Sequence, residues 1–243
     1  MILSIVIPAY NEEKRISKTI KEVATFLYTN HISFEIIVVP NNCSDNTEEV
    51  VKNLQMKEIP EIRIVNSLRV GTKGNTKGLA ISVGMKEAGG DFAIFIDADN
   101  ATSFNDVLKF IQCFKDGYDV IIASRYVNGA KILKKQPKTR IFLSRIGNLI
   151  IRTLLLPGIY DTQCGFKLFS KKAAQEIFSR TTVSGWGIDL EVLALARHLN
   201  FKIKELPVTW ESQDESTLKS HAFFYTLKEL FQIRKNIKNN IYE

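Results

Sequence analysis

The chain has 243 residues, of which 45% are hydrophobic and 24% charged, and this composition excludes a largely disordered protein. Its length suits one large or two small hydrophobic cores, and no uncharged apolar run is long enough for a membrane-spanning helix. The cysteines, Cys43, Cys113 and Cys164, form no CxxC pair, so we expect neither a zinc site nor a disulfide framework.

The net charge of +7 fits nucleic acid, anionic lipid or a phosphorylated substrate as a partner. Basic residues are spread along the chain, with concentrations at 131–152 and in the tail, and no aromatic-interleaved nucleic-acid motif accompanies them. We therefore expect no nucleic-acid partner. The apolar stretch 1–13 lacks a basic lead and runs directly into charged residues, so it predicts a first strand rather than a signal peptide.

In the first half, short β-rich apolar runs alternate with segments of helical periodicity. Strands are predicted at 2–8, 34–40, 61–67, 91–99 and 118–126, and helices at 12–30, 44–54, 76–89 and 106–117. Continuous apolar strands separated by amphipathic helices favour an α/β fold with one mostly parallel, Rossmann-like sheet covered on both faces.

The second half follows a less regular pattern. A basic loop over 128–140 precedes an apolar helix at 146–159, and 160–178 is interpreted as a loop and a helix. A helix at 185–200 and a strand at 201–210 follow. The tail, 216–243, predicts an amphipathic helix with a basic polar face.

Two aspartates follow the buried strand that ends in "AIFIDAD". Asp97 and Asp99 face the same side of an extended chain, roughly 6–7 Å apart by strand rise. Two neighbouring carboxylates repel each other, and a divalent cation removes that conflict. Hard oxygen ligands predict Mg²⁺ or Mn²⁺, with phosphate oxygens completing the coordination shell.

The stretches "SIVIPAYNEE", "VVPNNCSDNT", "KGLAISVG" and "IDADNAT" resemble, in order and spacing, family 2 glycosyltransferases of the GT-A fold. "YDTQCGFKLFSKKAAQEIF", "GWGIDLEVL" and "IKELPVTW" are similar to the dolichyl-phosphate β-glucosyltransferase branch, close to other polyprenyl-phosphate glycosyltransferases. The resemblance implies a GT-A domain over 1–215, with a nucleotide-sugar half at 1–125 and an acceptor half at 126–215.

For the donor, the resemblance implies that a UDP-sugar is bound at the strand ends, with Asp97 and Asp99 as ligands of the metal and diphosphate. The other implied donor residues are Pro8, Tyr10, Glu12, Asn41, Lys77 and Ala98. One of them departs from the family pattern, because Asn41 stands where the family has an aspartate that reads uracil. An amide oxygen still accepts a hydrogen bond from uracil, but without charge.

For the acceptor, a lipid phosphate needs cationic positioning rather than a strong base. Arg125, Arg140, Arg145 and Lys167 are the candidate phosphate ligands. Asp189, near the start of a predicted helix, has two open roles: general base for a hydroxyl acceptor, or orientation of a basic side chain. Asp99, Asp189 and Arg125 are the candidate catalytic residues.

The leading hypothesis is therefore an inverting, metal-dependent enzyme that transfers a hexose, glucose first, from a UDP-sugar to a polyprenyl phosphate. The alternatives are a soluble transferase acting on a saccharide hydroxyl and a weakly active nucleotide-sugar binding module. A lipid acceptor predicts peripheral contact with the cytoplasmic face of a membrane through 146–159 and the tail. The other interpretations of these helices are ordinary packing helices and a homo-oligomer contact.

Overall fold

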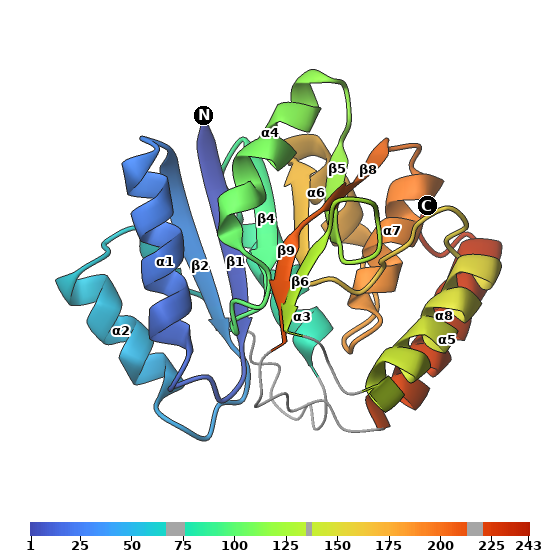
Figure 1. Ribbon diagram of the computed structural model, residues 1–243, viewed down its shortest axis with the longest axis horizontal. Helices are drawn as coiled ribbons and strands as arrows, with labels where there is room; N and C mark the ends of the chain where they lie inside the picture. Colours follow the sequence, from blue (N-terminus) through green and yellow to red (C-terminus); the bar gives the residue numbers. More distant parts are fainter. Residues whose placement is uncertain (67–75, 135–137, 213–220) are drawn as a thin grey trace.

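A seven-stranded sheet forms the centre of the computed structural model, which describes residues 1–66, 76–134, 138–212 and 221–243 (Figure 1). Its strand order is β3-β2-β1-β4-β7-β5-β8, and every pairing is parallel except those of β7 with β4 and β5. The strands are β1 (Ile2–Ala9), β2 (Ser33–Pro40), β3 (Ile62–Ile64), β4 (Phe92–Ile96), β5 (Val120–Ser124), β7 (Phe166–Ser170) and β8 (Ile203–Pro207). The predicted α/β class with a mostly parallel sheet is confirmed.

Helices cover both faces of this sheet, because its strands bury alternate side chains in two separate cores. In β1, Leu3 and Ile5 pack in one core and Val6 in the other. The first core includes α1 (Ile16–Thr29), α2 (Thr47–Lys57), a 3₁₀ turn (Phe104–Asp106) and α4 (Val107–Lys115). The second includes α3 (Lys77–Glu87), α5 (Lys138–Leu154), α6 (Lys171–Arg180), α7 (Ile188–His198) and α8 (His221–Lys238).

The second half departs from the sequence interpretation at four places. The helix predicted at 146–159 is α5, which begins earlier, at Lys138, and also ends earlier, at Leu154. The segment interpreted as a loop before α6 contains β7, which enters the middle of the sheet antiparallel to its neighbours. The basic loop contains β6 (Lys131–Lys134), and the last predicted strand is divided into β8 and β9 (Thr209–Glu211). Strands β6 and β9 pair as a separate two-stranded sheet. β7 was missed because "FKLFS" is short and carries a lysine among its apolar residues.

Strands β1, β2 and β4 are parallel, so their carboxyl ends lie at one edge of the sheet, the lower edge in Figure 1. An asparagine with positive φ follows each of the three strands: Asn11 (55°), Asn42 (54°) and Asn100 (55°). Asparagine tolerates this left-handed conformation better than most residues. The chain therefore turns sharply at three adjacent strand ends, which gathers the polar residues around them.

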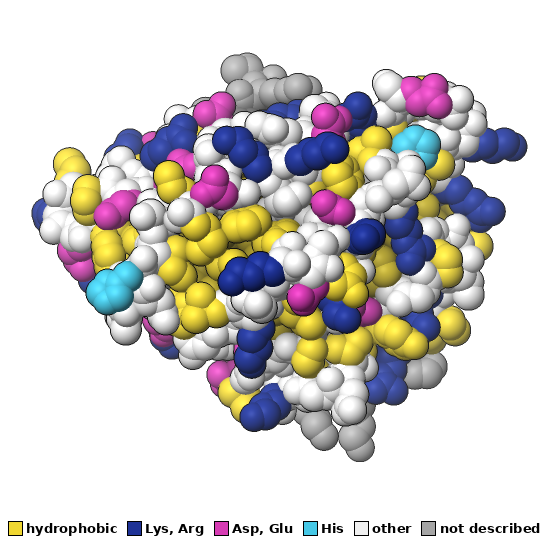
Figure 2. All heavy atoms as spheres, turned by 90° about the horizontal axis from the view of Figure 1, so that it is seen from above, with side chains coloured by type: hydrophobic (Ala, Val, Ile, Leu, Met, Phe, Trp, Pro, Cys, Tyr) yellow, Lys and Arg dark blue, Asp and Glu magenta, His cyan; other side chains and the backbone are white. Residues whose placement is uncertain are grey.

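The opposite edge of the sheet faces the viewer in Figure 2, where lysine and arginine side chains are scattered among acidic and apolar ones. No single basic patch occupies the part of this face that the structure describes, so the positive net charge is not focused there.

The antiparallel strand β7 should be essential to the stability of the fold. Phe166 is fully buried and packs edge-to-face on Phe110, with ring centroids 5.1 Å apart. We expect Phe166→Ala to lower the free energy of unfolding by about 3–5 kcal/mol, because it leaves a cavity in the first core. Urea denaturation measures this, with Leu108→Ala on the exposed face of α4 as the control. A loss no larger than that of the control would contradict the central place of β7.

Candidate functional site

Asp97, the first of the two aspartates after β4, has a counter-ion within the protein. The Lys77 ammonium, in the first turn of α3, lies 2.6 Å from Asp97 Oδ1. Asp99 is more enclosed, and its Oδ1 accepts a hydrogen bond from the backbone N–H of Ala101 at 3.0 Å. Lys77 therefore neutralises part of the negative charge that the sequence places at this strand end.

Electrostatic effects at this cluster follow from burial and proximity. Burial and the neighbouring Asp97 carboxylate raise the pKa of Asp99 above its ordinary value. Burial opposes the charge on Lys77, but the carboxylates of Asp97 and Asp189 raise its pKa above the ordinary lysine value. Lys77 thus stays a cation in the structure, and a second cation beside Asp99 would relieve the remaining repulsion.

A close backbone approach holds Asp97 in place. Its N–H donates to the carbonyl oxygen of Gly165, at 3.1 Å, in the loop that leads into β7. A β-carbon at Gly165 would lie 2.0 Å from Asp97 Oδ2, so any larger residue there would displace the Asp97 carboxylate. Gly165 belongs to the quoted stretch "YDTQCGFKLFS", but sequence reasoning gave it no role.

The residues present fit a divalent cation that is bound jointly with a substrate. Mg²⁺ is commonly held by one or two carboxylates, with waters and substrate phosphates completing its octahedral shell. Asp97 and Asp99 supply two carboxylates, and the side chain of Asp97 is 37% exposed. Within the described parts of the chain, no cluster of three or more histidine, cysteine or acidic side chains is arranged to hold a metal alone.

Asn41, at the end of β2, lies next to the start of α3. It is almost fully buried, and its amide oxygen accepts a hydrogen bond from the Thr76 hydroxyl, one residue before Lys77. The Thr76 hydroxyl therefore already donates a hydrogen bond to the amide oxygen that was expected to accept one from the nucleotide base. Tyr10 is 56% exposed just beyond β1, which leaves its ring available for stacking, whereas Pro8 lies within the strand.

Two further donor candidates are engaged by the protein itself. Both carboxylate oxygens of Glu12 accept from Arg15, at 2.8 and 2.9 Å, and burial raises the pKa of this carboxyl. The Ala98 carbonyl accepts from the Thr19 hydroxyl at 2.7 Å, and the Ala98 side chain packs in the first core. Arg15 thus already binds both carboxylate oxygens of Glu12, so any base or ribose contact of Glu12 would be made beside this ion pair.

Arg125, after β5, forms a buried ion pair that sequence reasoning missed. Its Nε and Nη2 donate to the carboxylate of Asp161 at 2.7 and 2.9 Å, and its backbone N–H donates to the same group at 2.9 Å. Although burial opposes ionisation, the guanidinium keeps the pKa of Asp161 below its ordinary value. The rings of Tyr126 and Trp210 each lie 5.4 Å from the guanidinium carbon. A buried arginine needs a carboxylate partner, so a search of the sequence for an acidic partner of Arg125 could have found Asp161.

Lys167 does not reach the surface, which corrects its assignment as a phosphate ligand. Its side chain is fully buried, and its ammonium pairs with Asp189 and donates to the Cys164 carbonyl at 2.7 Å. Asp189 is only 3% exposed. Of the two roles left open for Asp189, the geometry supports the orientation of a basic side chain.

The remaining phosphate candidates lie on α5. Arg145 is exposed on this helix, whereas the side chain of Arg140 lies outside the described residues.

Asp99 also borders a cavity of about 490 Å³, whose walls include Arg15 and Lys18 of the α1 region and Trp210 of β9. The structure thus pairs Lys77 with Asp97 and places Asp99 within electrostatic reach of both, whereas Arg145 is exposed on α5.

Removal of one charge from the Lys167–Asp189 pair should be costly. Asp189→Asn leaves the buried ammonium without its counter-ion, so we expect the free energy of unfolding to fall by about 3–5 kcal/mol. In the double variant Lys167→Met/Asp189→Leu both charges are absent, and most of that loss should be recovered. Urea unfolding of the three proteins measures this, and a single variant as stable as the parent chain would show that the pair is not buried.

Comparison with known proteins places the chain among sugar-transferring enzymes. Residues 4–178 match the family described as Glycosyl transferase family 2. A dolichyl-phosphate beta-glucosyltransferase of Trichomonas vaginalis is 35% identical over 242 residues, which cover 95% of this chain and 72% of the relative. Its Homo sapiens counterpart is 31% identical over 228 residues, covering 89% of this chain and 69% of that protein.

Solved structures agree on the fold. Glucosyl-3-phosphoglycerate synthase from Mycobacterium tuberculosis in complex with uridine diphosphate superposes with a TM-score of 0.67 at 17% identity, covering 96% of this chain and 80% of that one. The same enzyme in complex with Mn²⁺, UDP-glucose and phosphoglyceric acid gives a TM-score of 0.66. The GT-A fold and the predicted enzyme class are thereby confirmed, and the chain belongs to glycosyltransferase family 2.

Proposed function

We propose that this chain transfers glucose from UDP-glucose to dolichyl phosphate or a closely similar polyprenyl phosphate, inverting the anomeric centre. The observation that carries the proposal is the pair of aspartates at the carboxyl edge of the sheet, with the ammonium of Lys77, from the first turn of α3, bound to Asp97. The dolichyl-phosphate beta-glucosyltransferases among its relatives support the acceptor. A structural neighbour in complex with Mn²⁺ and UDP-glucose supports the donor and the metal.

On the donor side, Asp97 and Asp99 hold Mg²⁺ or Mn²⁺, which when bound would neutralise the charge that develops on the leaving diphosphate. Lys77 supplies a positive charge from the protein at the same point. Tyr10 presents an exposed ring for stacking on the base, and Asn41 lies at the neighbouring strand end. These residues bind and orient the donor without a proton transfer.

On the acceptor side, a phosphate monoester carries its own nucleophilic oxygen anion near neutral pH, since its second pKa is about 6. A general base is then unnecessary, which agrees with the burial of Asp189 against Lys167. This arrangement argues against the alternative of a saccharide hydroxyl acceptor, for which Asp189 would have to remove a proton. Arg125, held by Asp161, and the exposed Arg145 are the proposed cations for the acceptor phosphate.

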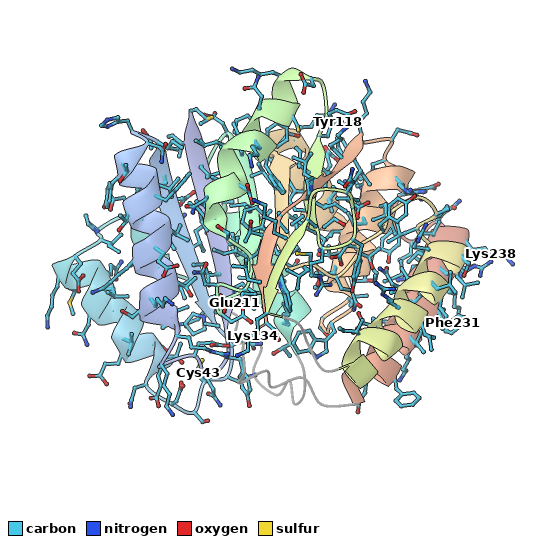
Figure 3. The ribbon with its side chains drawn as sticks, viewed as in Figure 1. Cys43, Tyr118, Lys134, Glu211, Phe231 and Lys238 are labelled. Carbon is cyan, nitrogen blue, oxygen red and sulfur yellow. The ribbon has the colours of Figure 1, made fainter. Side chains whose placement is uncertain are left out.

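A lipid acceptor requires contact with a bilayer, and we assign that contact to the outer surface of α5 and α8. The two helices contact each other and lie side by side (Figure 1). Leu149 of α5 is 60% exposed and Phe231 of α8 is 57% exposed. Figure 3 shows Phe231 and Lys238 projecting from α8 away from the sheet. Among the described helices, none is long and apolar enough to span a membrane.

Removal of one aspartate should lower the transfer activity without lowering the stability of the fold. Asp99→Ala should reduce glucose transfer from UDP-glucose to a short polyprenyl phosphate at least about a hundredfold, because it removes half of the carboxylate pair. The urea midpoint should stay near that of the parent chain. Asp116→Ala, at an exposed acid after α4, is the control. Radiolabelled transfer with Mn²⁺ and with a chelator measures the effect, and full activity of the variant would refute the metal assignment.

The membrane assignment predicts a loss of vesicle binding from two apolar changes. Leu149→Ser/Phe231→Ser should weaken sedimentation with anionic vesicles about tenfold, because two exposed apolar side chains no longer enter the interface. Binding of UDP-glucose should be unchanged. Met56→Ser, at a residue 73% exposed on α2, is the matched control. If the double variant sediments like the control, these helices are not the docking surface.

A further inference from the structure

The segment 182–187, here called the Trp186 segment, connects α6 to α7 without helix or strand structure. One side of it packs on the turn of α3 that carries Lys77. The Leu79 N–H donates to the Ser184 carbonyl at 3.1 Å, and the Lys77 ammonium lies 5.1 Å from the centroid of the Trp186 ring. The position of the Trp186 segment therefore bears directly on Lys77, which in turn pairs with Asp97.

The backbone of this segment is bound by a carboxylate from α8. Glu229 accepts from the N–H of Gly185 at 3.1 Å and from the N–H of Gly187 at 2.7 Å, the two residues that flank Trp186. A β-carbon at Gly185 would lie 2.3 Å from Glu229 Oε1, so the close approach requires glycine there. Both contacts are charge-assisted hydrogen bonds, which are stronger than those between neutral groups.

The same end of the chain also holds the start of the segment. Asn236, two helical turns after Glu229, donates to the Thr182 hydroxyl at 3.1 Å. The fully buried Glu191 of α7 accepts from the N–H groups of Thr182 and Val183, each at 2.9 Å, and from the Tyr242 hydroxyl at 2.7 Å. The inner face of α8 thus fixes the Trp186 segment at both ends, while its outer face carries Phe231.

We propose that Glu229 is a positioning residue for the transfer reaction, which sets the place of Lys77 at the donor end of the site by fixing the backbone on both sides of Trp186. The expected change in donor binding and kinetics rests on the proposed function, whereas the expected change in the position of the Trp186 segment does not. Glu229 acts through the Trp186 segment, so its loss should weaken the donor interaction and leave the acceptor interaction unchanged.

The test uses Glu229→Gln in the full chain, with Glu176→Gln as the matched control. Glu176 lies on α6 and forms a part-exposed ion pair with Arg180. Since the chain has two tryptophans, Trp210→Phe makes Trp186 the sole tryptophan reporter for the emission and quenching measurements, whereas the KM measurements use proteins that keep Trp210, whose ring lies beside Arg125. Emission of Trp186 without ligand, the Kd for UDP-glucose from its quenching, and KM for donor and for polyprenyl phosphate are measured, together with the urea midpoint.

In Glu229→Gln, we expect Trp186 emission at a longer wavelength, a donor Kd and KM raised about tenfold, and an acceptor KM within about twofold of the control. Emission, Kd and KM equal to those of the control would overturn the inference, as would equal weakening for donor and acceptor. If the parent chain neither binds UDP-glucose nor transfers glucose, the proposed function fails while the emission comparison still decides the positioning. Should Glu229→Gln not fold, Gly187→Ala displaces the same carboxylate and must give the same pattern, since its β-carbon would lie 2.7 Å from Glu229 Cβ.

Discussion

The site depends on how the chain neutralises two carboxylates that are separated by one residue just after β4. Two like unit charges roughly 6–7 Å apart repel each other by about 2.5 kcal/mol at an effective dielectric constant of 20, and a nearby cation offsets this cost. Here Lys77 pairs with Asp97, and the more enclosed Asp99 keeps a raised pKa. The carboxylates thus lie beside Lys77 and Arg15, and a metal ion bound together with a diphosphate would complete this electrostatic arrangement.

The surroundings of this cluster are organised to keep Lys77 in place. Gly165 from the β7 loop approaches the Asp97 carboxylate, and the Trp186 segment packs against the first turn of α3. α8 then bonds to that segment through Glu229. A chain of direct contacts thus extends from the outermost helix to the aspartates, and the helix that carries the proposed membrane surface also carries the proposed positioning residue.

The first half of the molecule was predictable from the sequence because its strands are continuous apolar runs and its helices have strong periodicity. Asp97 and Asp99 stand out locally as two acids that directly follow an apolar run, although β4 ends at Ile96 and residues 98–99 form a turn instead of the predicted extended strand. Asp161 did not stand out, because it lies 36 positions from Arg125, and no local pattern indicates which carboxylate a buried arginine will meet.

The burial of Lys167 was missed for a related reason. Its strand, β7, is short, and a lysine within it suggested a surface. Only the tertiary pairing with Asp189 makes full burial of that ammonium possible. Glu229 shows the same limit, since its partners lie 42 and 44 residues away, and an acidic residue on the basic, amphipathic tail reads as ordinary surface charge. Sequence periodicity reports which residues are buried, but it does not report long-range polar partners.

The central claim is that Asp97 and Asp99 exchange part of their interaction with Lys77 for a divalent cation when the donor binds. A crystal structure of the chain with Mn²⁺ and UDP-glucose tests it most directly. We expect a metal ion bound by the aspartates and the diphosphate, with the Lys77 ammonium withdrawn from Asp97. A bound donor with Lys77 still on Asp97 and no metal beside Asp99 would contradict it.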